Sequence, residues 1–213
     1  MAQSFTKGIP ISTDGTMAAN SDGLVSSQKA IVTYVTANAG GSGWVFLDSA
    51  TASSSATLDF TSSIDSTYYM YAFVLENIVP ASNSTLYIRT STDAGSSWDS
   101  GASDYSFAYV GYSGSVSGSG GGAESQISTG QTIGNASTES ASGIVYLQSP
   151  SNSSTFTQLT FLLSGLVSGG VGISRAGGGT RKSAADVTGI RFLMSTGNIS
   201  TGTIKMYGCC KPA

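Results

Sequence analysis

The chain has no histidine and few charged residues: its 213 residues include 9 Lys and Arg, 12 Asp and Glu, and no His. Without an imidazole, Ser-His-Asp and Cys-His catalysis and His-based zinc sites are excluded. Charged residues make up 10% of the chain, against roughly a quarter in an ordinary soluble domain. The side chains that usually cover helix surfaces are therefore scarce, so the composition disfavours a helical protein.

Long apolar runs and clusters of positive charge are also missing. The net charge is −3, and the cations are too scattered for the phosphate neutralisation that nucleic-acid binding requires. No apolar run approaches the roughly 20 residues that cross a bilayer, and the N-terminal residues lack the apolar core of a signal peptide. We therefore expect a protein that is made in the cytoplasm, stays soluble, inserts into no membrane and binds no nucleic acid.

Small residues are abundant in place of charged ones: the chain has 40 Ser, 23 Thr and 28 Gly. Apolar residues come in short runs between Ser- and Gly-rich turns, which predicts β-strands. Alternation within 155–161 and 203–207 places one strand face on a core and the other in water. The fold predicted is an all-β, antiparallel β-sandwich of jelly-roll type. The expected strands cover 44–47, 56–60, 68–78, 85–92, 105–112, 144–148, 155–166, 171–174, 187–195 and 202–207.

The N-terminal residues differ in texture from the rest of the chain. Residues 26–37 have the pattern of a short helix, with Ser26 as N-cap and with Ala30, Ile31, Tyr34 and Val35 on one face. A Gly-rich linker follows at 39–43. We therefore expect an attachment segment over 1–43, with an extended and helical stalk, and a β-sandwich head over 44–213.

Two Gly-rich segments could be mistaken for functional sites. Residues 113–142 are the longest stretch without an expected strand and predict a mobile loop, in which only Glu124 and Glu139 could act chemically. Residues 177–183 end like a phosphate loop, but Arg181 stands where that motif needs glycine. The glycines of 118–122 open no helix. We predict no nucleotide site, no other cofactor and no metal site.

The segment from Ser91 to Trp98 fits the Asp-box pattern Ser-x-Asp-x-Gly-x-x-Trp, with Ser91, Asp93, Gly95 and Trp98 at the defining positions. The pattern predicts a hairpin corner in which Asp93 accepts backbone N–H bonds, Gly95 supplies a left-handed φ and Trp98 folds back over the turn. A β-propeller would repeat the motif every 40 to 50 residues. A single copy is present, which leaves the sandwich as the predicted fold.

Few side chains remain that could make functional contacts. Trp98, Tyr105, Tyr109 and Tyr112 surround the corner and the next strand, and are candidates for contacts with a glycan or a partner. On a regular strand, however, Tyr105, Phe107 and Tyr109 share one face, and that stripe also fits a core. Adjacent Cys209 and Cys210 are either two thiols or the site of an intersubunit disulfide.

Three tracts resemble known proteins. Residues 14–35, DGTMAANSDGLVSSQKAIVTYV, are similar to a segment common in fibre and appendage proteins of tailed bacteriophages. Residues 86–105 and 189–208 also resemble β-rich phage virion proteins. The resemblance implies a homotrimeric virion appendage, which docks to other virion proteins through residues 1–40, with a helix that associates with its copies and a β-sandwich head.

Three functions follow as expectations. The first is a non-enzymatic virion structural protein, a tail or collar fibre whose head contacts a host-surface glycan. The second is a capsid decoration protein with the same fold. The third is a polysaccharide depolymerase that acts through carboxylates among Asp93, Asp99, Asp104 and Glu124, although these Asp residues are also ordinary turn formers.

Overall fold

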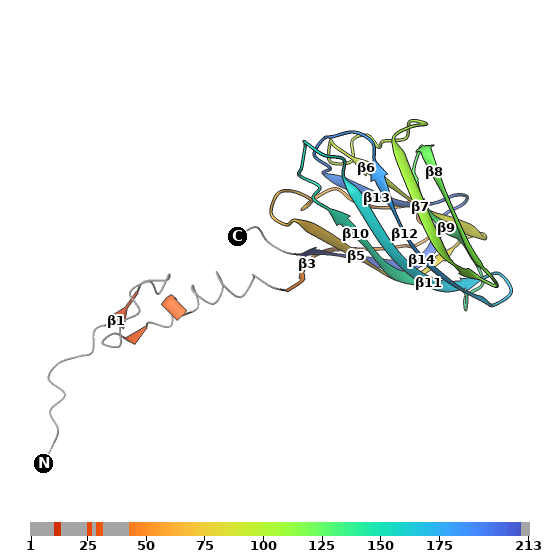
Figure 1. Ribbon diagram of the computed structural model, residues 1–213. Helices are drawn as coiled ribbons and strands as arrows, with labels where there is room; N and C mark the ends of the chain where they lie inside the picture. Colours follow the sequence, from red (N-terminus) through yellow and green to blue (C-terminus); the bar gives the residue numbers. More distant parts are fainter. Residues whose placement is uncertain (1–10, 14–24, 27–28, 32–42, 210–213) are drawn as a thin grey trace, which may run out of the picture. The chain divides into compact units, whose positions relative to one another are not determined.

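The computed structural model describes residues 11–13, 25–26, 29–31 and 43–209 (Figure 1). The chain divides into two compact units, Met1–Gly43 and Trp44–Ala213. In the first unit, β1 (Ile11–Ser12) pairs in parallel with β2 (Val25–Ser26). Of the helix predicted over 26–37, residues 29–31 are helical and 26 lies in β2, while the others lie outside the described residues.

The second unit contains two antiparallel sheets packed against each other, which confirms the predicted all-β sandwich (Figure 1). The larger sheet has the strand order β3-β14-β5-β10-β11-β12-β7-β8, and the smaller has the order β4-β13-β6-β9. The larger sheet comprises β3 (Val45–Thr51), β5 (Met70–Pro80), β7 (Tyr105–Ser113), β8 (Val116–Glu124), β10 (Ala141–Gln148), β11 (Gln158–Val167), β12 (Val171–Arg181) and β14 (Ile199–Cys209). The smaller comprises β4 (Thr57–Phe60), β6 (Ser84–Ser91), β9 (Ile127–Ile133) and β13 (Gly189–Met194).

The core lies between the sheets and is built by alternation along the strands. Every second residue of β6 points inward, so Leu86 and Ile88 are fully buried. At its centre, Phe60, Phe73 and Phe192 come from β4, β5 and β13, with ring centroids 5.3 to 6.3 Å apart. These three rings therefore join the two sheets.

The prediction of a mobile loop over 113–142 is wrong. This stretch contains β8 and β9. β8 consists largely of Ser and Gly, and seven of its nine residues pair with residues of β7, whose side chains are larger. In β9, Ile127 and Ile133 are buried and Thr129 lies between them on the same face. That alternation is a strand signal that the surrounding polar residues concealed.

Two further boundaries differ from expectation. Phe156 was predicted to lie in the strand 155–166, but it precedes the strand and is 50% exposed. The regular strand begins at Gln158, because the pair Thr157-Gln158 interrupts the alternation. β12 also continues to Arg181, and a Cβ at Gly179 would stand 2.6 Å from Ile127 of β9. The Gly-rich run at 177–179 thus allows close packing inside a strand.

The first and last strands of the sandwich are neighbours. β3 and β14 pair antiparallel, with Val45 opposite Gly208. In the part of the chain that the structure describes, no helix is long and apolar enough to span a membrane.

Candidate functional site

The corner between β6 and β7 is built around the carboxylate of Asp93. Its Oδ1 accepts hydrogen bonds from the Ser91 hydroxyl at 2.7 Å and from the Ser97 amide at 2.8 Å. The amide of Gly95 donates to the Ser91 hydroxyl at 2.9 Å. Ala94 and Gly95 both take left-handed φ angles, +53° and +85°. The backbone therefore reverses sharply within four residues, and the two short polar side chains satisfy the amides that the reversal leaves unpaired.

The pKa of Asp93 is lowered to about 2 because the Ser97 and Ser91 hydroxyls and the Ser97 amide donate to its carboxylate. Ionised Asp93 thus favours the folded chain above its unfolded pKa of 3.8, and this contribution is lost as the pH falls through about 2. We expect the carboxyl carbon of Asp93 to titrate in NMR spectra with a midpoint near 2.

The Ser97→Ala variant should move that midpoint up towards 3.8, because it removes the strongest donor to the carboxylate. Ser96→Ala is the matched control, since the Ser96 hydroxyl donates to the main-chain oxygen of Asp93 rather than to its carboxylate. Equal midpoints in the two variants would contradict this account of the corner.

Trp98 closes the corner over the smaller sheet. Its ring lies 4.3 Å from the guanidinium of Arg191, which in turn forms a two-pronged ion pair with Asp59 at 2.7 and 2.8 Å. A Cβ at Gly95 would approach Thr61 within 2.4 Å and Trp98 within 3.2 Å. Trp98 is therefore occupied by contacts within the chain that hold the corner against β13 and β4.

Asp99 and Asp104 also hold parts of the chain together. Asp99 accepts from Arg181 Nε at 2.6 Å and from the Thr90 hydroxyl at 3.1 Å. Asp104 accepts from the amide of Gly101 at 2.6 Å. The three aspartates that were candidates for hydrolytic chemistry thus each have hydrogen-bond partners within the corner and its surroundings.

The two glutamates of the Gly-rich stretch have different surroundings: Glu139 is held in a turn, whereas Glu124 lies opposite Tyr105, the chain neighbour of Asp104. Glu139 is 8% exposed and accepts from the amides of Gly169 at 2.9 Å and Ala136 at 3.2 Å. Glu124 ends β8 opposite Tyr105. Within the described ranges, no three His, Cys, Asp or Glu residues are grouped so that they could hold a metal ion.

The tyrosines predicted as surface contacts have different environments. Tyr105 is fully buried, and its hydroxyl accepts from the Thr90 amide at 2.8 Å, so it is not available to a ligand. Burial raises the pKa of Tyr105 to about 12. Tyr109 is half-buried and stacks on Phe107 with centroids 6.2 Å apart. Of these three tyrosines, Tyr112 alone lies on the other face of β7, where it is 50% exposed.

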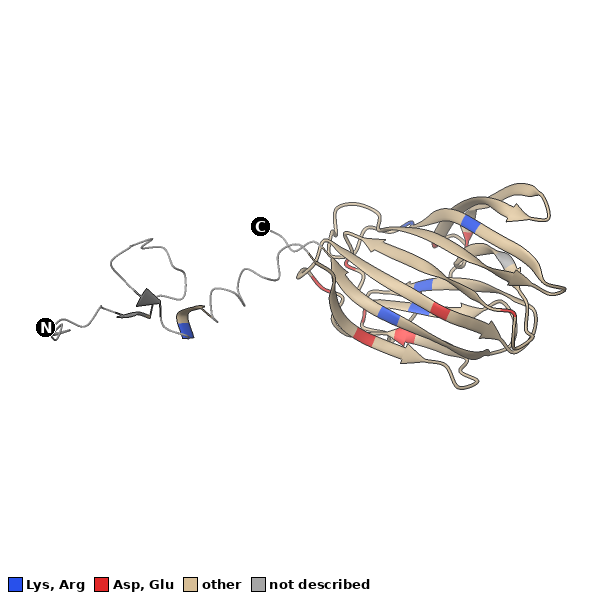
Figure 2. Ribbon diagram, turned by 90° about the horizontal axis from the view of Figure 1, so that it is seen from below, with Lys and Arg blue, Asp and Glu red and all other residues tan. Residues whose placement is uncertain are grey.

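The outer face of the larger sheet is uncharged over five strands. The registers place no Asp, Glu, Lys or Arg among the outward residues of β10, β11, β12, β7 and β8. Figure 2 shows how few charged residues the sandwich carries. We define the apolar patch as the four most exposed hydrophobic residues of this face: Val110, Tyr112, Val116 and Leu162, which are 50 to 78% exposed. The smaller sheet contrasts with it, because Asp59, Arg89 and Arg191 form a row there.

The strand β8 leaves one edge of this sheet open. Among the strands that the structure describes it pairs with β7 alone, and its residues Val116–Gly121 include no charge and no proline. The other edge strand, β3, carries Asp48 and faces a register irregularity at Met206/Tyr207. Charges and bulges are the usual means of blocking edge pairing. The pairing of β8 with β7 also has a register irregularity, between Tyr105 and Phe107, and the strand ends at Glu124, so the part of this edge that lacks both charge and bulge is Val116–Gly121.

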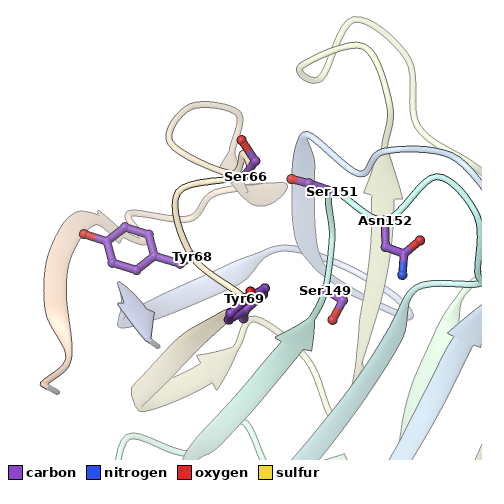
Figure 3. A pocket seen from close by; sticks show the side chains of 6 residues that line it. All are labelled: Ser66, Tyr68, Tyr69, Ser149, Ser151 and Asn152. Carbon is purple, nitrogen blue, oxygen red and sulfur yellow. The ribbon is translucent and has the colours of Figure 1, made fainter. Parts of the chain in front are cut away.

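Two adjoining hollows lie at one end of the sandwich, the first between the β4–β5 and β10–β11 loops and the second along the β10–β11 loop. The first, of about 280 Å³, is lined by Ser66, Tyr68, Tyr69, Ser149, Ser151 and Asn152 (Figure 3). The second, also of about 280 Å³, is lined by Gln148, Ser149, Asn152, Thr155, Phe156 and Gln158. They share Ser149 and Asn152, and we call them together the end site.

The sequence did not indicate the end site. Tyr69 and Phe156 lie in runs that were predicted to be strands, and the structure places both just before a strand begins, where they are 57% and 50% exposed. The turn at 149–152 is visible in the sequence as Ser-Pro-Ser-Asn. Its proximity to Tyr69 is not visible, because residues far apart in sequence meet there.

Of the two adjacent cysteines, the structure describes Cys209. Cys209 ends β14 and is 1% exposed, so its sulfur is not presented at the surface of the chain. Cys210 lies outside the described residues, and the intersubunit disulfide remains a prediction.

Comparisons with protein-family models, with curated proteins and with solved structures find no match to this chain.

Proposed function

We propose that this chain is a non-enzymatic structural protein of a bacteriophage virion, a tail- or collar-fibre-type appendage whose heads associate with one another. The observation that carries the proposal is the open edge of β8 beside the apolar patch. An unblocked edge strand favours pairing with another chain, and a cluster of exposed apolar side chains favours protein contact. The resemblance of residues 14–35 to phage appendages supports the virion setting.

The partner that fits this surface best is a second copy of the chain. The free-energy cost of desolvation is lowest when an uncharged face meets another uncharged face, because burying a charge without a partner is costly. The Ser and Gly residues of β8 also lose little side-chain entropy on contact. We propose a trimer as the assembled form.

Charging the β8 edge should separate the copies. We expect full-length protein at micromolar concentrations to sediment as an oligomer and Val116→Lys to shift it towards monomer, with at least a tenfold weaker association. Val171→Lys is the matched control, because Val171 is 41% exposed and lies outside the apolar patch. A monomeric wild type, or equal behaviour of the two variants, would contradict self-association through β8.

The position in the particle is tested separately. Antibody against this protein should label one end or the neck of purified virions in electron micrographs. Label distributed over the whole capsid would identify a decoration protein instead, and particles without any label would refute the virion assignment.

A further inference from the structure

We infer that the end site binds an uncharged carbohydrate, with one sugar ring over Tyr69 and the next over Phe156. The inference does not depend on the proposed function, because the end site contains no residue of β8 or of the apolar patch. It rests on the exposed rings, the polar groups between them, the lack of charge and the rigidity of the turn that the two hollows share.

The two rings provide apolar surfaces of the kind on which sugars stack. Tyr69 is 57% exposed and lines the first hollow, and Phe156 is 50% exposed and lines the second. Tyr68, which also lines the first hollow, is 8% exposed and packs edge-on against Tyr71 with ring centroids 5.8 Å apart. Aromatic faces of this kind supply contact area at a low cost in conformational entropy.

The groups between the rings are hydroxyls and amides. Ser149 and Asn152 line both hollows, and Ser151 and Gln158 line one each. Such groups can both donate and accept hydrogen bonds, as sugar hydroxyls do. Each hollow is close to the lower end of ligand-site volumes, about 300 Å³. That size suits single sugar rings, and the shared residues place the two rings in succession.

The lining favours a neutral ligand. Among the described residues, no Asp, Glu, Lys or Arg lines either hollow. The carboxylate of Asp65, on the β4–β5 loop next to Ser66, accepts from the Thr67 amide at 2.7 Å and from the Tyr71 hydroxyl at 3.1 Å. These bonds, above all those from Thr67, lower the pKa of Asp65 and direct its charge into the loop. A uronic acid or sialic acid would find no cation in the lining.

The turn between the hollows is held in one conformation. Ser149 has a φ of +46°, which is uncommon for a residue other than glycine. Its amide donates to the Tyr69 carbonyl at 2.7 Å, and its own carbonyl accepts from the Asn152 amide at 3.1 Å. The Asn152 side-chain oxygen accepts from the Ser154 amide at 3.0 Å. A non-glycine residue kept at positive φ by surrounding bonds is a feature of preorganised sites.

Calorimetric titration of the full chain tests the inference. The probes are neutral oligosaccharides of glucose, galactose, mannose and N-acetylglucosamine, from monosaccharide to hexasaccharide, with galacturonic acid oligosaccharides as charged counterparts. We expect at least one neutral series to bind, with a clear gain in affinity from the monosaccharide to the disaccharide and none for the charged series. Tyr69→Ala and Phe156→Ala should each weaken binding by roughly tenfold.

The controls separate binding from folding and from assembly. Phe46→Ala removes another exposed ring, 56% accessible and outside the end site, and should leave the affinity unchanged. Val116→Lys should also leave it unchanged, so a failure of self-association does not imply a failure here. No binding by any neutral series, a preference for the charged series, or equal affinities in Tyr69→Ala, Phe156→Ala and Phe46→Ala would overturn the inference.

Discussion

Replacing Asp99 with alanine should lower the free energy of unfolding by about 3 kcal/mol. The side chain of its partner, Arg181, is 7% exposed, and Asp99 itself is 24% exposed. Removing the carboxylate leaves a largely buried guanidinium without its counter-charge, which costs more than the pair contributes as a whole. For a domain of this size the midpoint of thermal unfolding should fall by roughly 6 to 12 °C, which calorimetry would measure.

Two comparisons test the cause. Glu76→Ala breaks an ion pair of similar length with Lys205 at 2.8 Å, but both side chains are more than a third exposed, so we expect little change. The double variant Asp99→Ala/Arg181→Met should recover part of the loss, because it leaves no buried charge. If Asp99→Ala and Glu76→Ala have equal effects, burial of Arg181 is not what makes the pair important.

Phe73→Ala should have a comparable or larger effect, a loss of roughly 3 to 5 kcal/mol. Phe73 is fully buried and lies against both Phe60 and Phe192, with centroids 5.3 and 5.5 Å away. Alanine would leave a cavity at the point where the two sheets meet, and the rigid strands around it allow little collapse. Chemical denaturation monitored by circular dichroism would measure the change.

Phe46→Ala is the control for this variant too. Phe46 is 56% exposed and contacts Tyr207 at the edge of the larger sheet, so its removal opens no cavity. A small loss for Phe73→Ala, similar to that of Phe46→Ala, would mean that the sheets close over the gap and that the three phenylalanines do not set their spacing.

The sequence predicts this fold well where side chains alternate and poorly where side chains are small. β6 was found because Leu86 and Ile88 recur at every second position. β8 was missed because Ser and Gly carry no such signal, and its pairing depends on the neighbouring strand β7. The early part of 155–161 was misassigned for the converse reason: Phe156 is apolar but precedes the strand.

For the candidate sites too, the sequence predicts contacts between neighbouring residues and does not predict contacts between distant ones. The Asp-box corner follows from a local pattern, because its bonds join residues within a few positions of Asp93. The core interpretation of the Tyr105, Phe107 and Tyr109 stripe is confirmed for Tyr105, but its hydrogen bond to Thr90 and the nearby Arg181 could not be predicted, since they come from other strands. The end site brings together Tyr69 and Asn152, which are separated in the chain by the strands β5 to β10. Such long-range contacts depend on how the strands pair, so the spacing of residues along the sequence does not predict them.

The adjacency of β3 and β14 has a consequence for how this head can be joined to other chains. Neighbouring strands lie about 5 Å apart, and Val45 stands opposite Gly208, so the head begins and ends at almost the same point. A module with this geometry can be spliced into an exposed loop of a host protein through two short connections, without pulling the loop open. It can also be opened at another loop and rejoined at its original ends, so the order of its strands along a gene can change while the sandwich stays the same.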